Sequence, residues 1–131
     1  MFSKPSSCSG CPLFDPPFGS SSGWVEADGT GSSGVLMILE AGGKNEAEAG
    51  LPVVGRAGHY LFSQLARVGL EREIFRIDNC CKCQPPSNKL VKMPYEHSAI
   101  AHCAPNLDAT IADMQARCQQ TGKHFTILTL G

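Results

Sequence analysis

Residues 35–43 read VLMILEAGG, a short apolar run that ends in a carboxylate and two glycines. Its apolar part, residues 35–39, has the length and composition of a strand that is buried in a parallel sheet. Two later runs, residues 74–77 and 125–130, are also short and largely apolar, and they predict a second and a third strand.

In the segments between these strands, apolar residues recur at the spacing of a helix. Within residues 56–68, four apolar side chains recur on one helical face, and Gly69 follows as a residue that commonly ends a helix. Beyond Pro94 we expect one or two helices, the later one marked by apolar residues at positions 107, 111, 114 and 118. The order strand, helix, strand, helices, strand predicts an α/β fold with right-handed crossovers and a mainly parallel sheet.

The chain divides into two parts by composition. Residues 1–34 hold two cysteines and much Gly, Ser and Pro, which predicts an N-terminal arm followed by a Gly/Ser-rich loop. Residues 35–131 form the α/β part, which we expect to be incomplete at its C-terminus because three parallel strands are few and both faces of such a sheet need cover. The letters GTGSSG at 29–34 match a dinucleotide fingerprint, but a strand follows them where a helix is required, so a loop is predicted.

Charge and cysteine content limit the setting in which this chain works. With 11 basic and 12 acidic side chains, no global field draws it to nucleic acid, and any such contact must be local, for example at Lys82, Lys89 and Lys92. The seven cysteines are odd in number, no basic-then-apolar leader is present, and no apolar stretch reaches the roughly 20 residues that span a bilayer. We therefore expect a cytoplasmic protein without a membrane partner.

Four cysteines, at positions 8, 11, 83 and 103, form a close pair and two distant singletons, a layout that predicts a metal centre joining the N-terminus to the middle of the domain. Four thiolates suit tetrahedral zinc as well as an iron-sulfur cluster. The three remaining cysteines, at positions 80, 81 and 118, are expected to be buried small hydrophobes or spare thiols.

Polar residues follow the first two predicted strands. In an open parallel sheet, ligands bind outside the carboxyl ends of the strands. By that rule we expect one crevice to be lined by residues that follow the three strands: Glu40, Gly42, Gly43, Asn79 and Gly131. A carboxylate, two glycines that permit close backbone approach and an amide that both donates and accepts would meet a ligand there.

A series of short motifs in a fixed order resembles the iron-sulfur uracil-DNA glycosylases. The matching segments are LEAGGKNE at 39–46, GLPVVGRAG at 50–58, GLERE at 69–73, IDNCCKCQPPSN at 77–88, Glu96 with CAPNL at 103–107, and LG at 130–131. The resemblance covers nearly the whole chain from Cys8 onward. It implies the three-layer α/β/α fold of that family, in a bacterial, archaeal or phage-encoded protein.

The resemblance also implies a cofactor and a reaction. The cofactor is a 4Fe-4S cluster of structural role, with zinc the less favoured metal, and its ligands would be Cys8, Cys11, Cys83 and Cys103. The reaction is hydrolysis of the N-glycosidic bond of uracil in DNA, as in base excision repair, which requires the nucleotide to be flipped out of the stack.

Roles for the site residues follow from the same resemblance. Asn79 would read the hydrogen-bonding edge of uracil, and Glu40 would orient water or stabilise positive charge on the sugar. Glu46 would act as an acid placed behind the residues that touch the substrate. The remaining substrate-binding positions would be Ala41, Gly42, Gly43 and Val53.

The chain departs from the family pattern at several places. Leu39 replaces a glycine, Gly42 replaces a proline, and Val53 replaces the phenylalanine expected to stack on the flipped base, a contact worth roughly 1–3 kcal/mol. The family's last motif, His-Pro-Ser, is not found in the sequence. These departures predict weak base capture and low activity.

Three classes of function therefore remain open. The first is a DNA-repair glycosylase that acts on DNA containing uracil. The second is an inactive iron-sulfur module of the same fold that binds nucleic acid or partners with replication or repair proteins. The third is a structural zinc domain unrelated to DNA, since a fold alone does not fix function.

Overall fold

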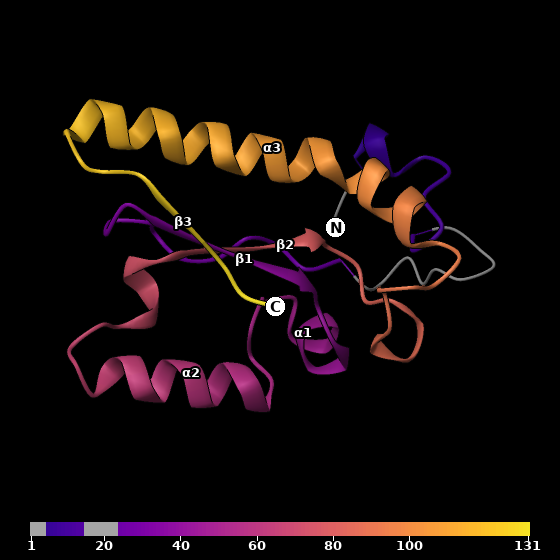
Figure 1. The fold of residues 1–131 in the computed structure, drawn as a ribbon, viewed down its shortest axis with the longest axis horizontal. Coiled ribbons are helices and arrows are strands. Elements are labelled where there is room, and N and C mark those ends of the chain that lie inside the picture. Colours follow the sequence, from indigo (N-terminus) through magenta and orange to yellow (C-terminus); the bar gives the residue numbers. More distant parts are fainter. Residues whose placement is uncertain (1–4, 15–23) are drawn as a thin grey trace.

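The computed structural model describes residues 5–14 and 24–131. Its sheet has three strands, β1 (Val35–Ala41), β2 (Arg76–Cys81) and β3 (Thr126–Thr129), in the order β2-β1-β3. Both neighbours run parallel to the central strand β1, as Figure 1 shows. The predicted α/β class and parallel sheet are confirmed.

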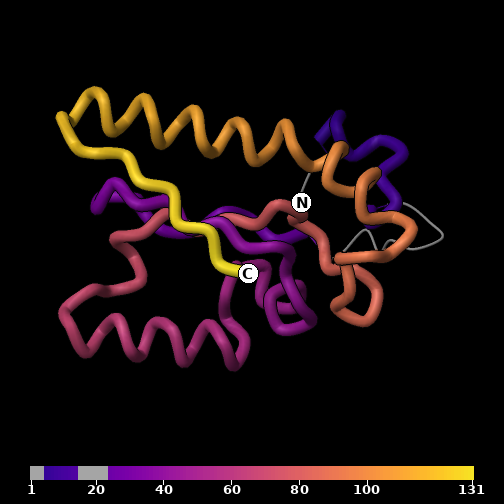
Figure 2. Tube along the Cα trace, viewed as in Figure 1, coloured from indigo at the N-terminus to yellow at the C-terminus, as the bar shows by residue number. Residues whose placement is uncertain are grey.

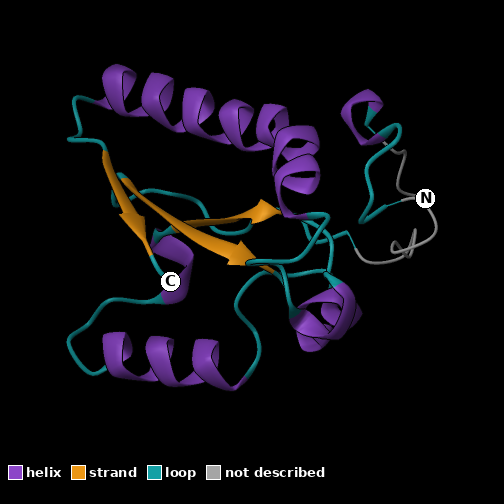
Figure 3. Cartoon of the chain, turned by 45° about the vertical axis from the view of Figure 1, so that its right-hand side comes forward, coloured by secondary structure: helices purple, strands orange, loops and turns teal. Residues whose placement is uncertain are grey.

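Helices cover both faces of this sheet. The α-helices are α1 (Lys44–Ala49), α2 (Arg56–Ala66) and α3 (Glu96–Thr121), and three short 3-10 helices lie at Ser6–Cys8 (η1), Arg72–Ile74 (η2) and Pro86–Asn88 (η3). Figure 3 shows α3 above the sheet and α2 below it. The fold is therefore the expected three-layer α/β/α arrangement, whereas the short helix α1 was not predicted.

Alternation along β1 divides the core between the two helical layers. Leu36 and Ile38 pack with Met114 and Cys118 of α3. Met37 packs on the other side, in a cluster that includes the partly buried α2 residues Leu61, Phe62 and Leu65. Both faces of β1 are thus apolar, which explains its unbroken hydrophobic run.

The strand at 74–77 was predicted too early in the sequence. Ile74 belongs to the 3-10 helix η2, and β2 begins at Arg76 and runs to Cys81. Polar residues continue this strand because Asp78 finds partners within the protein, so apolar character alone could not mark its end.

One helix, α3, follows Pro94, in agreement with the one or two expected there, and it contains Pro105. Proline has no amide hydrogen and clashes with the preceding turn, so it bends a helix. Figure 3 shows this change of direction towards the N-terminal end of α3. The first turns of the helix, which carry Cys103, face the 3-10 helix η1.

The N-terminal arm is not wholly irregular. Val25 donates its amide hydrogen to the Lys82 carbonyl (2.7 Å), and Asp28 and Ile77 exchange backbone hydrogen bonds of 2.9 and 2.8 Å. Residues 24–28 therefore run antiparallel along the outer edge of β2. The rest of the predicted arm includes residues 1–4 and 15–23, which lie outside the described residues, and the division at residue 34 stays a prediction.

The GTGSSG segment at 29–34 is the predicted loop. Gly29, Gly31 and Gly34 all have left-handed backbone angles. A Cβ atom on Gly34 would lie 2.3 Å from the His124 carbonyl oxygen, so glycine is required where the loop meets the approach to β3.

The opposite edge of the sheet is formed by β3. Its four residues are exposed, with Ile127 and Leu128 each 43% accessible. Figure 2 shows the last segment of the chain running alongside β1 to Gly131. Within the described part of the chain, no helix is long and apolar enough to cross a membrane.

Candidate functional site: a buried cysteine cluster beside a pocket

The four predicted metal ligands come together in one buried cluster. Cys8 (3% exposed), Cys11 (5%), Cys83 (4%) and Cys103 (6%) all belong to it. Apolar side chains from the N-terminal segment and from the start of α3 complete the cluster, among them Leu13, Phe14, Leu90, Tyr95 and Ala99. The fold thus joins the N-terminus to the middle of the chain, as the cysteine spacing predicted.

The sulfur atoms also influence one another electrostatically. Burial, and after it the charges of Cys103, Cys8 and Cys11 in that order, raise the pKa of Cys83 to about 12. Burial likewise raises the pKa of Cys103, although its sulfur accepts hydrogen bonds from the Lys82 amide (3.3 Å) and the Asn106 side chain (3.9 Å). Without a metal these two thiols stay protonated at neutral pH, so metal binding must release protons.

The four buried thiols match a metal centre in the number and type of its ligands. Among residues 5–14 and 24–131, no three His, Cys, Asp or Glu side chains are close enough together to hold one metal ion. Around a single zinc, with Zn–S bonds of about 2.3 Å, four sulfurs would crowd to about 3.8 Å from one another. In a 4Fe-4S cluster each cysteine binds a different iron, so the sulfurs stand farther apart.

A buried ion pair lies between this cluster and the sheet. Lys82 (4% exposed) pairs with Asp78 (1%), whose second carboxylate oxygen accepts a 2.7 Å hydrogen bond from the Thr110 hydroxyl. The Lys82 ammonium also lies 5.8 Å from the centre of the Trp24 ring. The prediction that Lys82 meets phosphates is therefore wrong, because its charge is neutralised inside the protein, whereas Lys89 and Lys92 are exposed.

A pocket of about 370 Å³ opens at the carboxyl ends of the strands. β1 and α2 supply most of its walls, and the end of the chain closes one side. The lining residues are Leu39, Glu40, Ala41, Val53, Ala57, Leu61, Leu130 and Gly131. Three of the predicted site residues, Glu40, Ala41 and Val53, thus line one cavity.

Asn79 lies beside this pocket on the neighbouring strand. It pairs in register with Leu39, so both side chains point to the α2 side of the sheet. Asn79 is 2% exposed, and its side-chain nitrogen Nδ2 has no hydrogen-bond partner among the described residues. A buried amide hydrogen without an acceptor costs about 1–3 kcal/mol, which a ligand oxygen at this position would recover.

Glu40 differs from Asn79 in both exposure and direction. It is exposed at the end of β1, and strand alternation turns its side chain to the face opposite Leu39. Its negative charge raises the pKa of Cys80, after burial and the charges of Asp78 and Cys103. The structure therefore brings Glu40 to the rim of the crevice and Asn79 to its buried side.

The two glycines after β1 serve the packing of the protein. A Cβ atom on Gly42 would lie 3.1 Å from a methyl carbon of Val25, and the Gly43 amide donates a 3.0 Å hydrogen bond to Glu46. Neither glycine lines the pocket of Leu39 and Val53. Their assignment to substrate stays a prediction, with the Gly43 amide already occupied in this structure.

Glu46 connects two loops that border the pocket. Its carboxylate accepts hydrogen bonds from the amides of Gly43 (3.0 Å), Val54 (3.2 Å) and Gly55 (2.9 Å). This fits the expected place of Glu46 behind the substrate-contacting residues. Sequence reasoning named the acid but not its three partners.

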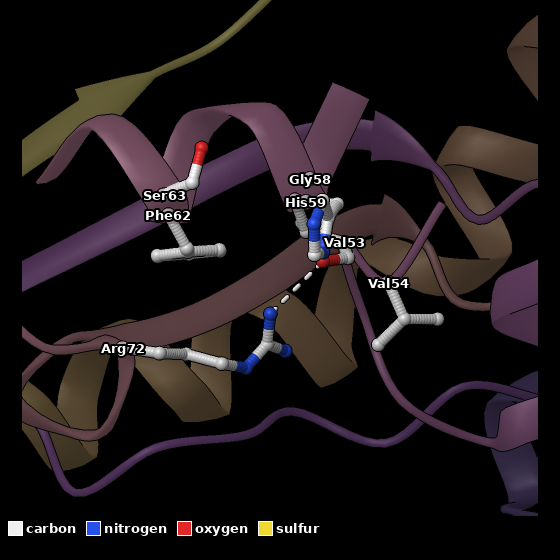
Figure 4. Close-up of a pocket in the computed structure, with 7 residues that line it drawn as sticks. All are labelled: Val53, Val54, Gly58, His59, Phe62, Ser63 and Arg72. Atoms are coloured by element: carbon white, nitrogen blue, oxygen red, sulfur yellow. Dashed lines mark hydrogen bonds between the residues drawn. The ribbon is translucent and has the colours of Figure 1, made fainter. Parts of the chain in front are cut away.

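Sequence reasoning missed the role of Arg72. Its guanidinium donates a 2.9 Å hydrogen bond to the Val53 carbonyl, contacts the Pro52 carbonyl, and pairs with Asp28 at 3.2 Å. It also stacks over the Phe62 ring, 4.8 Å from the ring centre. Figure 4 shows Arg72 reaching the Val53 carbonyl across a second pocket of about 370 Å³. The only sequence signal was the position of Arg72 within GLERE at 69–73.

Val53 itself has an unusual backbone. Its φ angle is +56°, which a β-branched residue rarely adopts. A Cβ atom on Gly58 would lie 2.1 Å from the Val53 carbonyl oxygen, so glycine at 58 is required for this loop to pack on α2. A strained residue held by its surroundings at the edge of a pocket is typical of a binding site.

Comparison with known proteins agrees with this combination of an α/β/α fold, a buried cysteine cluster and a pocket at the strand ends. The profile of the Uracil DNA glycosylase superfamily matches residues 28–126. The chain therefore belongs to this superfamily, as its motifs led us to expect.

The individual relatives that match this chain are type-4 uracil-DNA glycosylases. The chain is 35% identical over 104 residues to the type-4 uracil-DNA glycosylase of Sulfurisphaera tokodaii, covering 78% of this chain and 46% of the relative. It is 36% identical over 93 residues to the type-4 enzyme of Pyrobaculum aerophilum, covering 71% and 45%. The corresponding protein of Thermotoga maritima is 34% identical over 95 residues, covering 72% and 47%. The chain thus spans about half the length of these relatives.

Proposed function

We propose that this chain holds the uracil-recognition part of a uracil-DNA glycosylase, which removes uracil from DNA by hydrolysis of the N-glycosidic bond. The observation that carries the proposal is the buried Asn79 amide, whose Nδ2 atom has no partner among the described residues. Uracil offers a carbonyl acceptor next to an N–H donor, and one amide satisfies both. With the amide in the orientation that suits uracil, the amino group of cytosine would face Nδ2, and both groups are donors.

The pocket beside Asn79 suits a flat base. Leu39, Val53 and Leu61 contribute apolar walls, and its volume of about 370 Å³ accommodates a pyrimidine. Val53 would contact the base in place of an aromatic ring. Because valine cannot stack on the base, binding would lose roughly 1–3 kcal/mol relative to an aromatic residue. We therefore expect the chain to bind uracil more weakly than a relative with an aromatic residue there.

Glu40 would act at the rim of the site. Its carboxylate would stabilise positive charge that develops on the sugar, or it would orient water. Ala41 lines the same pocket and would contact the substrate through its small side chain. The amides of Gly42 and Gly43 would reach substrate only after the Gly43–Glu46 hydrogen bond opens.

The four buried cysteines would hold a 4Fe-4S cluster. Cys8 and Cys11 come from the N-terminal segment, Cys83 follows β2, and Cys103 lies on α3, so a bound cluster would join three segments of the fold. Its role would be structural, because ligand binding adds directly to folding free energy. DNA containing uracil would be the partner, with Lys89 and Lys92 exposed to meet phosphates.

Excision and binding assays on the same anaerobic preparation test the proposal. Single-stranded oligonucleotides that contain one uracil or one cytosine would be compared for cleavage and for affinity by fluorescence anisotropy. We expect a preference for uracil that Asn79→Ala abolishes and that Gln120→Ala, at an exposed amide on α3, leaves unchanged. Equal affinity of the native chain for both oligonucleotides would reject Asn79 as the uracil reader.

The same experiment separates the enzyme from the inactive module. Uracil preference with release of the base identifies a glycosylase. Uracil preference without release identifies a binding module that shares the fold.

A further inference from the structure

A fifth thiol lies inside the cysteine cluster. Cys81 is fully buried (0% exposed) and belongs to the same cluster as Cys8, Cys11, Cys83 and Cys103. The resemblance names four cysteine ligands and gives no role to Cys81. An additional sulfur among four metal ligands is chemically unlike an additional methyl group, since it can itself bind iron.

The strand fixes the direction of this thiol. Cys81 is the last residue of β2, and alternate residues of a strand point to the same side, so Cys81 and Cys83 share the side of the metal cluster. Cys80 points to the other side, where it packs with Leu36, Ile38 and Met114. Two adjacent cysteines thus face different layers of the protein.

Among the predicted ligands, Cys103 has the most direct contact with this part of β2. Its sulfur accepts a 3.3 Å hydrogen bond from the Lys82 amide, which is the nitrogen of the Cys81–Lys82 peptide bond. The side chains of Cys81 and Cys103 also belong to the same buried cluster. The sulfurs of Cys81 and Cys103 therefore approach the same place, one from the sheet and one from α3.

We propose that Cys81 is a reserve ligand of the metal centre, able to take the place of Cys103 on the iron that Cys103 binds. The inference rests on the proposed 4Fe-4S cluster. In the exchange the bond from iron to the Cys103 sulfur breaks and a bond from the same iron to the Cys81 sulfur forms. The proton of the Cys81 thiol passes to the Cys103 thiolate, so charge and iron oxidation state do not change.

Cys81 and Cys103 are held by different parts of the fold. This difference explains why Cys81 would replace Cys103 and not the reverse. β2 is hydrogen-bonded to β1 on one side and to residues 24–28 on the other, which fixes Cys81 in the sheet. Cys103 lies in the first turns of α3, ahead of the bend at Pro105. Movement of those turns would withdraw Cys103 and leave Cys81 in place.

The test compares iron binding in three variants of the full chain. Cys103→Ala removes the predicted ligand without supplying a new oxygen donor. Cys103→Ala/Cys81→Val also removes the proposed reserve, and Cys103→Ala/Cys80→Val is the matched control at the adjacent cysteine. Iron and sulfide per chain, the visible spectrum and the electron paramagnetic resonance of the reduced cluster would be recorded after anaerobic reconstitution.

We expect Cys103→Ala and its Cys80→Val control to retain most of the iron and sulfide of the native chain, with a shifted resonance spectrum. Cys103→Ala/Cys81→Val should lose the cluster. The proposal is overturned if Cys103→Ala alone loses the iron, or if the Cys80→Val and Cys81→Val doubles retain equal amounts. A native chain that binds no iron would refute the proposed cluster itself, which separates the two failures.

A second measurement avoids variants that fail to fold. In the otherwise native chain, Cys81→Val should release iron to a chelator several-fold faster than Cys80→Val, because iron that has lost Cys103 is no longer recaptured. Equal release rates in the two variants would overturn the proposal.

Discussion

The Glu46 carboxylate is the strongest candidate for a single residue that maintains the shape of the pocket. It lies in the first turn of α1 and accepts amide hydrogen bonds from Gly43 (3.0 Å), Val54 (3.2 Å) and Gly55 (2.9 Å). Two loops that are distant from one another in sequence are thereby joined by one charge. Glu46→Ala removes both carboxylate oxygens and with them all three hydrogen bonds, whereas Glu46→Gln keeps the size of the side chain but replaces one oxygen by an NH₂ group.

The expected cost follows from these contacts. A hydrogen bond to a charged group contributes about 1.5–3 kcal/mol, but the Val54 bond is exposed and water would replace part of what is lost. We expect Glu46→Ala to lower the free energy of unfolding by about 3 kcal/mol, roughly a 100-fold change in the folding equilibrium. Glu46→Gln should cost about half as much, because its amide oxygen still accepts from one loop.

Urea unfolding of the metal-loaded protein, followed by circular dichroism, measures these changes. Glu48→Ala is the matched control on the same helix, since Glu48 is exposed and makes only a 3.9 Å ion pair with Lys44. It should shift the free energy of unfolding by no more than about 0.5 kcal/mol. The reasoning is refuted if Glu46→Ala and Glu48→Ala destabilise the protein equally.

Three further predictions concern packing, the buried ion pair and the thiols. Gly58→Ala should destabilise the protein by about 1–3 kcal/mol, because its Cβ atom would meet the Val53 carbonyl at 2.1 Å; an unchanged melting temperature would contradict this contact. Lys82→Met leaves the Asp78 carboxylate buried without its cation and should cost about 3–5 kcal/mol in urea unfolding, and a smaller loss for Asp78→Asn/Lys82→Met would confirm the pairing. In the metal-free protein, burial raises the pKa of Cys83 from 9.0 to about 12, so its contribution to stability is present below pH 9.0 and lost as the pH rises towards 12. Cys83→Ala should flatten that dependence in unfolding experiments, and an identical slope in both proteins would argue against it.

The strands and the cysteine centre were predictable because their signals are local or chemical. The run at 35–39 is apolar at every position, as expected for a strand with helices on both faces. The four cysteines are unusual enough in type to be grouped without knowledge of the fold. The fold buries all four in one cluster, together with Cys81, and their role as metal ligands stays a prediction.

What the sequence did not reveal depends on which side chains pair with one another in the folded protein. The buried pair of Asp78 and Lys82 reads as an acid at a strand end and a base in a positive stretch, and only the fold shows that each neutralises the other. Arg72 likewise reads as a surface charge, yet it holds the carbonyls of Pro52 and Val53. Composition and periodicity give no information on such partners, because neither specifies which polar groups meet once the chain is folded.

The loop at Val53 shows how a substitution can change a site while its framework stays in place. Its left-handed backbone costs of order 1–3 kcal/mol for a β-branched residue and persists only when the surroundings fix it. Arg72 binds the Val53 carbonyl, Gly58 admits that carbonyl against α2, and Glu46 binds the next two amides. None of these contacts uses the side chain at position 53. Replacing an aromatic ring by valine therefore alters what the loop presents to a base without releasing the loop, so binding should weaken while the pocket keeps its shape.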